Sequence, residues 1–116
     1  MEKVIKMTLL FDFYGQLLTE RQQRFIELYY GHDFSLGEIA DQYGVTRQAV
    51  HDTLKRAGKI LNDYEDKLGL LDKFMTERNK ITEALELLRG YRQDPKPEQL
   101  DRVEKILTEI TELSEE

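Results

Sequence analysis

A set of polar side chains at helical spacing near the middle of the chain is the strongest candidate for a functional site. We expect a helix that begins at Arg47. If Ala49, Val50 and Leu54 face inward, the 3.6-residue period fixes which side chains face outward. The outward set is Thr46, Arg47, Gln48, His51, Asp52 and Lys55. Side chains of these types can contact base edges and phosphates of DNA.

Each member of this outward set has its own chemistry. Arginine can bind guanine, and glutamine can bind adenine, through paired hydrogen bonds, so Arg47 and Gln48 are the candidate base readers. Thr46 and Lys55 suit phosphate contacts. Asp52 either accepts a hydrogen bond from a cytosine amino group or weakens DNA binding through its charge. The alternative for the two candidate base readers is an ordinary solvated helix start.

The sequence carries no pattern for catalysis or metal binding. It has no cysteine, and its two histidines, His32 and His51, do not have a metal-ligand spacing. Neither a phosphate-cradling glycine-rich loop nor a serine nucleophile motif occurs. We therefore expect no enzyme activity, no cofactor and no metal, and we expect His51 to be an exposed surface residue.

The candidate site requires a tight turn between two short helices, and the sequence matches that requirement. Ala40 is the small residue where the helices would come closest. Gly44, four residues later, permits a left-handed backbone. Val45 would fill the turn, and Val50 would return to the core. This spacing is typical of a helix-turn-helix.

Capping residues mark where both of these helices begin. Ser35 and Glu38 form an S-x-x-E capping box, in which each side chain satisfies a backbone N–H of the first turn. Thr46 is the predicted N-cap of the second helix. Any one of these signals is common, but all of them at the required spacing predict a helix-turn-helix.

Helical spacing also extends over the N-terminal segment. We predict a helix over residues 2–14 that ends at Gly15, followed by a helix capped by Thr19 that ends in a turn at residues 31–33. The first helix has apolar residues on two sides, which must both be covered. The two stripes are Val4, Met7, Phe11, Tyr14 and Leu18, and Ile5, Leu9 and Phe13.

The helix that begins at Arg47 is predicted to be long and to break at Gly69. A further helix to Leu88, a loop over residues 89–97 and a final amphipathic helix over 98–113 complete the chain. Apolar residues of the long helix continue past the break at heptad spacing: Val50, Leu54, Ala57, Leu61, Tyr64, Leu68, Leu71 and Met75.

This heptad pattern has two interpretations. It is either the inner stripe of a helix that covers the N-terminal bundle, or part of a two-fold contact that also includes Leu9 and Phe13. The two-fold contact would set two recognition helices about 34 Å apart on DNA. Because a lone module makes few phosphate contacts, we favour a homodimer.

Charge is distributed unevenly along the 116 residues, whose net charge is −6. Residues 35–60 carry four bases and three acids, whereas residues 61–116 carry nine bases and fifteen acids. The total argues against general binding of polyanions. With no secretory signal and no apolar run near the roughly 20 residues that span a bilayer, we expect a cytoplasmic protein.

Residues 17–61 resemble region 4 of bacterial sigma factors. The similarity lies in L-T-x-R-Q, the Tyr30-Gly31 turn and L-x-E-I-A-x-x-Y-G-V-T-R-Q-x-V. Over its whole length the chain resembles the YlxM family of small bacterial proteins, with LLFDFYGQLLTERQQRFIELYY and YGVTRQAVHDTLKRA as the specific parts. The YlxM resemblance implies a regulator linked to the signal recognition particle pathway by gene neighbourhood. Without sigma regions 2 and 3, it could not recruit polymerase as a full sigma factor does.

The sequence therefore predicts an all-α helix-turn-helix bundle of one domain over residues 1–116. Its parts are an N-terminal helix (1–18), the helix-turn-helix module (19–68) and acidic C-terminal helices (69–116). The predicted function is binding of double-stranded DNA in its major groove for transcriptional regulation. One alternative is a non-catalytic protein- or RNA-interaction module that has lost DNA binding and contacts signal recognition particle components or RNA polymerase. Another is an acidic tail that covers the recognition helix and competes with DNA.

Overall fold

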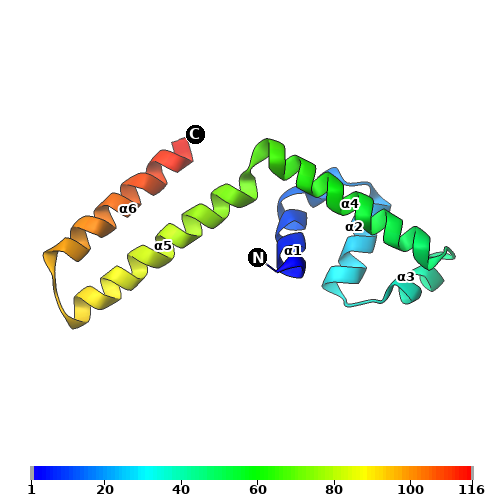
Figure 1. Ribbon diagram of the computed structural model, residues 1–116, viewed down its shortest axis with the longest axis horizontal. Coiled ribbons are helices and arrows are strands. Elements are labelled where there is room, and N and C mark those ends of the chain that lie inside the picture. The colour runs from blue at the N-terminus through cyan, green and yellow to red at the C-terminus, as the bar shows by residue number, and fades with distance from the viewer. Residues whose placement is uncertain (1, 116) are drawn as a thin grey trace. The chain divides into compact units, whose positions relative to one another are not determined.

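The computed structural model describes residues 2–115 as a succession of helices (Figure 1). No strand occurs within this range, so the prediction of an all-α fold is confirmed. The chain divides into two compact units, Met1–Leu71 and Asp72–Glu116. The elements are α1 (Lys3–Tyr14), η1 (Gly15–Leu17), α2 (Glu20–Ile26), η2 (Glu27–Gly31), α3 (Leu36–Tyr43), α4 (Arg47–Leu68), α5 (Leu70–Gln93) and α6 (Pro97–Glu115).

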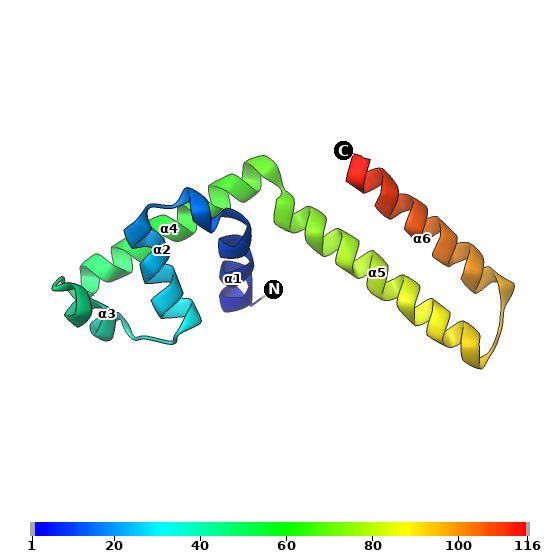
Figure 2. The ribbon, with the colours of Figure 1, turned by 180° about the vertical axis from the view of Figure 1, so that it is seen from behind.

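Helix α4 is the central element of the first unit. Helices α1, α2 and α3 all pack against it (Figures 1 and 2). Its heptad positions Val50, Leu54, Ala57 and Leu61 are buried inside this unit. The inner-stripe interpretation is therefore confirmed for these positions, and they are not available for contact with a second copy.

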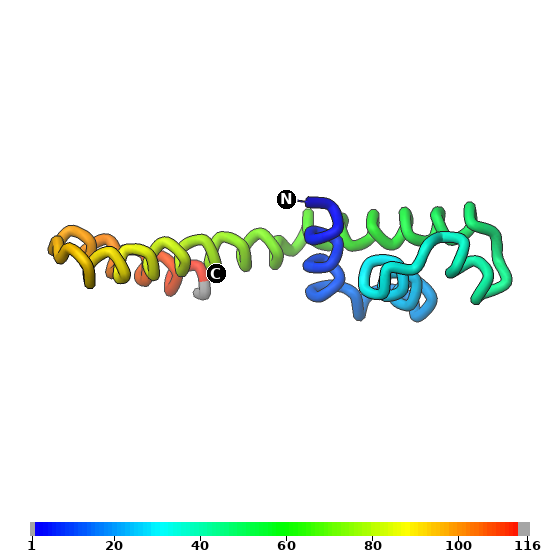
Figure 3. Tube along the Cα trace, turned by 90° about the horizontal axis from the view of Figure 1, so that it is seen from below, coloured from blue at the N-terminus to red at the C-terminus, as the bar shows by residue number. Residues whose placement is uncertain are grey.

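Helix α1 crosses α4 and buries only one narrow side (Figure 3). Its buried residues are Met7, Leu10 and Tyr14. The predicted stripe is wrong at Val4, which is 47% exposed, and it omitted Leu10, which is fully buried. The second apolar stripe remains largely on the surface, since Ile5 is 52% exposed. Because α1 crosses α4 at an angle, the two helices touch over a short length only, and side chains near the start of α1 stay exposed.

The predicted helix starts are confirmed because their capping bonds are formed. Thr19 and Gln22 make a capping box at α2, and Ser35 and Glu38 make one at α3. The Thr46 hydroxyl accepts a hydrogen bond from Ala49 N at 3.0 Å. Local sequence signals thus determine where these three helices begin.

The predicted break at Gly69 is also confirmed, because this residue ends α4 with a left-handed φ of 64°. The predicted loop over residues 89–97 occurs but is shorter, residues 94–96, since α5 continues to Gln93 and α6 begins at Pro97. Gly90 lies inside α5, where a glycine costs only about 1 kcal/mol relative to alanine. Proline is favourable at the first helical position, so Pro97 starts a helix where a loop was expected.

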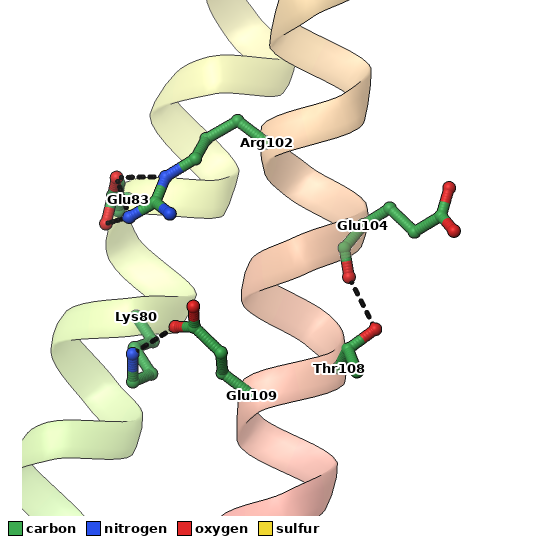
Figure 4. Close-up of polar contacts among 6 residues, drawn as sticks. All are labelled: Lys80, Glu83, Arg102, Glu104, Thr108 and Glu109. Carbon is green, nitrogen blue, oxygen red and sulfur yellow. Dashed lines mark hydrogen bonds and ion pairs between the residues drawn. The ribbon is translucent and has the colours of Figure 1, made fainter.

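The second unit is a hairpin in which α5 and α6 run antiparallel (Figures 1 and 2). Its buried core consists of Ala84, Val103 and Ile106. Lys80 donates a hydrogen bond to Glu109, and Arg102 Nε donates to Glu83 Oε1 at 3.1 Å (Figure 4). Several larger apolar side chains of this hairpin stay 40% or more exposed: Ile81, Leu85, Leu88, Leu100 and Leu107.

A partly buried hydrogen-bond network joins α1 to the turn between α4 and α5. The Tyr14 hydroxyl donates to Glu65 Oε1 at 2.7 Å and accepts from Leu70 N at 3.1 Å. Leu71 N donates to the same Glu65 oxygen at 2.9 Å. Burial, and then the hydrogen bond to Glu65, raise the pKa of Tyr14, so its hydroxyl stays protonated at neutral pH.

Replacing this hydroxyl tests the contribution of the network to stability. We expect Tyr14→Phe to lower the free energy of unfolding by about 1–3 kcal/mol, because Leu70 N loses its acceptor and Glu65 loses a donor. Urea denaturation followed by circular dichroism measures the change. Tyr29→Phe is the matched control, since the Tyr29 hydroxyl makes no hydrogen bond among residues 2–115. Equal stability of the two variants would contradict the assignment.

The α5–α6 hairpin is expected to weaken in acid through Glu109. Its hydrogen bond from Lys80 lowers the pKa of this carboxyl below the ordinary 4.5. The stabilisation is therefore present at neutral pH and is lost as pH falls through the lowered pKa. We expect Glu109→Gln to be less thermostable than the wild type at pH 7 and to lose that difference in acid. Glu104→Gln is the control, since the Glu104 carboxylate is turned away from α5 (Figure 4), and it should show no such convergence.

Candidate nucleic-acid interface

The corner between α3 and α4 has the geometry of a helix-turn-helix. Gly44 ends α3 with φ of 66° and ψ of 36°, a left-handed conformation that costs other residues about 1–2 kcal/mol. Val45 N donates to Ala40 O at 3.0 Å, which closes the turn. Ala40 and Val50 are buried on either side of this corner, as the sequence pattern predicts. The chain therefore leaves the corner with the start of α4 held in one orientation.

All of the predicted outward residues lie on the exposed side of this corner and helix. They are Thr46, Arg47, Gln48, His51, Asp52 and Lys55. The prediction that His51 is an exposed surface residue is confirmed. No residue of the outward set is covered within the first unit, so this face of α4 is open to a ligand.

Ala49 corrects the predicted division of α4 into two faces. It was expected to face inward, but it is exposed. Successive helical residues are rotated by about 100°, and the buried line through Val50, Leu54 and Ala57 leaves Ala49 outside it. A small apolar side chain on this face can contact a thymine methyl group. Ala49 therefore belongs to the candidate interface. The sequence prediction missed it because it assigned apolar residues to the inner face.

Asp52 is in contact with two neighbours on the exposed face. Gln48 Nε2 donates a hydrogen bond to Asp52 Oδ1 at 2.9 Å. His51 Nδ1 lies 3.6 Å from the same oxygen, and both of these side chains are 54% exposed. One hydrogen of the Gln48 amide is thus held by Asp52, and the second hydrogen of this NH2 group remains able to donate to a base. Asp52 therefore limits the orientations in which Gln48 can contact a base.

Arg47 folds back over the first turn of α3. A Cβ placed on Gly37 would lie 3.1 Å from Arg47 Nε and 3.3 Å from its Nη2. Gly37 therefore leaves room for the guanidinium, a role that the sequence pattern did not predict. Neither Arg47 nor Lys55 pairs with a carboxylate among the described residues. Two cations on this face are thus available to an anionic partner.

The part of the chain that the structure describes shows neither a cluster suited to a metal ion nor a membrane-spanning helix. Residues 2–115 hold no group of three or more His, Cys, Asp or Glu side chains that could bind a metal ion. None of their helices has the length and apolar content needed to cross a membrane. The exposed face of α4 remains the candidate site.

Comparisons with known proteins agree with this geometry. A family described as "Putative helix-turn-helix protein, YlxM / p13 like" (UPF0122) matches residues 1–103. A UPF0122 protein of Desulforamulus reducens is 58% identical over 112 residues, covering 97% of this chain and 96% of the relative. The UPF0122 protein YlxM of Bacillus subtilis is 47% identical over 94 residues, covering 81% and 86% of the two chains. The chain therefore belongs to the UPF0122 family of YlxM-like helix-turn-helix proteins, as its sequence resemblance indicated.

Proposed function

We propose that this chain is a non-catalytic transcriptional regulator that binds the major groove of double-stranded DNA through the exposed face of α4. The observation that carries the proposal is the open first half of α4 directly after the Gly44 corner. In helix-turn-helix proteins the second helix enters the major groove with its N-terminal residues toward the bases. Arg47 and Gln48 are the base readers, and Thr46 and Lys55 contact phosphates.

We propose that the chain binds DNA as a homodimer, because one module offers few cations for phosphate contacts. The heptad positions from Val50 to Leu61 are buried, whereas Leu68 at the end of α4 is 56% exposed, so a two-fold contact must use Leu68 or apolar residues outside this pattern. Val4, Ile5 and Phe13 of α1 are 47%, 52% and 37% exposed, which makes that helix a candidate contact. Contributions of separate phosphate contacts to the binding free energy add, so two modules together bind DNA much more tightly than one. Each contact contributes about −0.9 to the slope of log affinity against log salt concentration.

A second candidate function is supported by the α5–α6 hairpin. Its exposed apolar side chains and the net charge of −6 favour a protein partner over a polyanion. In this alternative the chain is an interaction module that contacts signal recognition particle components or RNA polymerase. Purification with a protein partner after nuclease treatment supports it, whereas bound DNA in the purified sample supports the main proposal.

Removing the Arg47 guanidinium tests the role of α4 in base recognition. We expect Arg47→Ala to weaken binding to a DNA site, selected from a random oligonucleotide pool, by about 5- to 150-fold, because a bidentate base contact is worth about 1–3 kcal/mol. Fluorescence anisotropy with labelled duplex measures the affinity. Arg92→Ala, an exposed arginine of α5, is the matched control and should leave binding unchanged. A pool without selectivity, or identical curves for both variants, would contradict the proposal.

Removing the Asp52 charge tests whether this residue opposes DNA binding. We expect Asp52→Asn to tighten binding about two- to fivefold, the range of exposed charge interactions, because it removes the repulsion between the carboxylate and DNA phosphates and weakens the hydrogen bond that holds Gln48. The matched control is Asp66→Asn, an exposed aspartate near the C-terminal end of α4. If Asp52 instead accepts a hydrogen bond from cytosine, the variant will bind the selected site more weakly.

A further inference from the structure

A groove in the first unit lies between α1, η2 and the exposed side of α4. Its volume is about 500 Å³. Small-molecule sites commonly occupy about 300–1,000 Å³ and combine an apolar lining with a few polar groups. The groove is therefore large enough for a ligand, and its lining decides which chemistry fits.

The base of the groove is apolar and is shaped by Gly58. A Cβ on Gly58 would lie 3.1 Å from Met7 Cε, so the absence of a side chain lets α1 approach the α4 backbone. Met7 and Leu54 line the groove and are only 8% and 9% exposed. The apolar part of a ligand would gain free energy by leaving water at this surface.

Two tyrosines of η2 form an aromatic wall. The rings of Tyr29 and Tyr30 meet edge to face, with centroids 5.0 Å apart and planes at 82°. Neither hydroxyl makes a hydrogen bond among the described residues. Partial burial, and then the neighbouring Tyr29, raise the pKa of Tyr30. Its hydroxyl is therefore protonated at neutral pH and can donate to a ligand.

Cations from two helices line the groove, and no acidic side chain is among its lining residues. Lys3 of α1 and Lys55 of α4 have no carboxylate partner within residues 2–115. Lys59 also lines the groove but pairs with Asp63 at 3.1 Å. The remaining unpaired positive charge favours an anion.

We propose that this groove binds a small anion that carries an aromatic ring. The ring packs against the tyrosines and the apolar base, and the anionic group is held by Lys3 and Lys55. Nucleoside phosphates and aromatic carboxylates share this chemistry. Nothing in the proposal requires DNA, so the groove can be tested on the protein alone.

The groove also shares residues with the DNA-facing side of α4. His51 and Lys55 line the groove and belong to the outward set. An anion that occupies Lys55 removes a cation from the DNA contact, so ligand and DNA compete. This second step rests on the proposed DNA binding, whereas the ligand site does not.

Calorimetric titration of the full chain tests the ligand site. The probes are adenosine 5′-monophosphate and indole-3-acetate, which carry a ring and an anion. Adenosine and inorganic phosphate each lack one feature and should bind about tenfold more weakly, because each loses one of the two sets of contacts. Binding of only one of the first two probes shows whether the groove takes a nucleoside phosphate or an aromatic carboxylate. No binding by either at about 1 mM would overturn the proposal.

A charge-matched pair of variants locates the site. Lys3→Ala/Lys55→Ala removes the two groove cations, and Lys6→Ala/Lys67→Ala removes two exposed lysines that do not line the groove. We expect the first variant to bind the better probe about tenfold more weakly, and the second to bind it as the wild type does. Equal loss in both variants would show only a general charge effect and would overturn the assignment.

Competition is measured by adding the bound probe to the protein–DNA complex and following anisotropy. Release of DNA at probe concentrations that saturate the groove supports competition, and an unchanged complex overturns it. If the chain binds the probe but no DNA from the selected pool, the proposed DNA function fails while the ligand site stands.

Discussion

Burial of one stripe of α4 is the constraint on which the first unit depends. Val50, Ala57 and Leu61 are fully buried, and each large aliphatic side chain in such a position contributes about 1.5–3 kcal/mol. Helices α1, α2 and α3 all use this stripe as their common contact. Because the stripe fixes the rotation of α4 about its axis, it also fixes which side chains face outward. The same packing that buries one side of α4 therefore determines which residues form the candidate interface.

Much of the fold could be predicted because its signals are local. Thr19, Ser35 and Thr46 cap helices through bonds to residues three positions away, and Gly44 and Gly69 adopt the left-handed backbone expected of them. Such interactions involve residues close together in the sequence, so the sequence alone predicts them. The same signals placed the α3–α4 corner and thus the outward set.

The features that sequence reasoning missed depend on contacts between distant segments. Which side of α1 is buried follows from its crossing of α4, so Leu10 replaced Val4 in the core. Ala49 is exposed because the buried stripe of α4 is narrow, and alanine alone does not indicate a face. The hydrogen bond from Gln48 to Asp52, and the space that Gly37 leaves for Arg47, require side-chain positions. The periodicity of the sequence predicts which face of a helix is exposed, but it does not predict the side-chain contacts on that face.

Net charge is a poor guide to what the exposed face of α4 can bind. Residues 1–71 contain nine bases and eleven acids, so most of the negative charge belongs to the remaining residues. At physiological salt, interactions between exposed charges fade beyond about 8 Å, and only nearby groups decide the local potential. The charged side chains on the exposed face of the first half of α4 include Arg47, Asp52 and Lys55. Under the proposed DNA binding, so few phosphate contacts require that discrimination between DNA sequences come mainly from base contacts, and an anion bound at Lys55 would remove a large share of the remaining attraction.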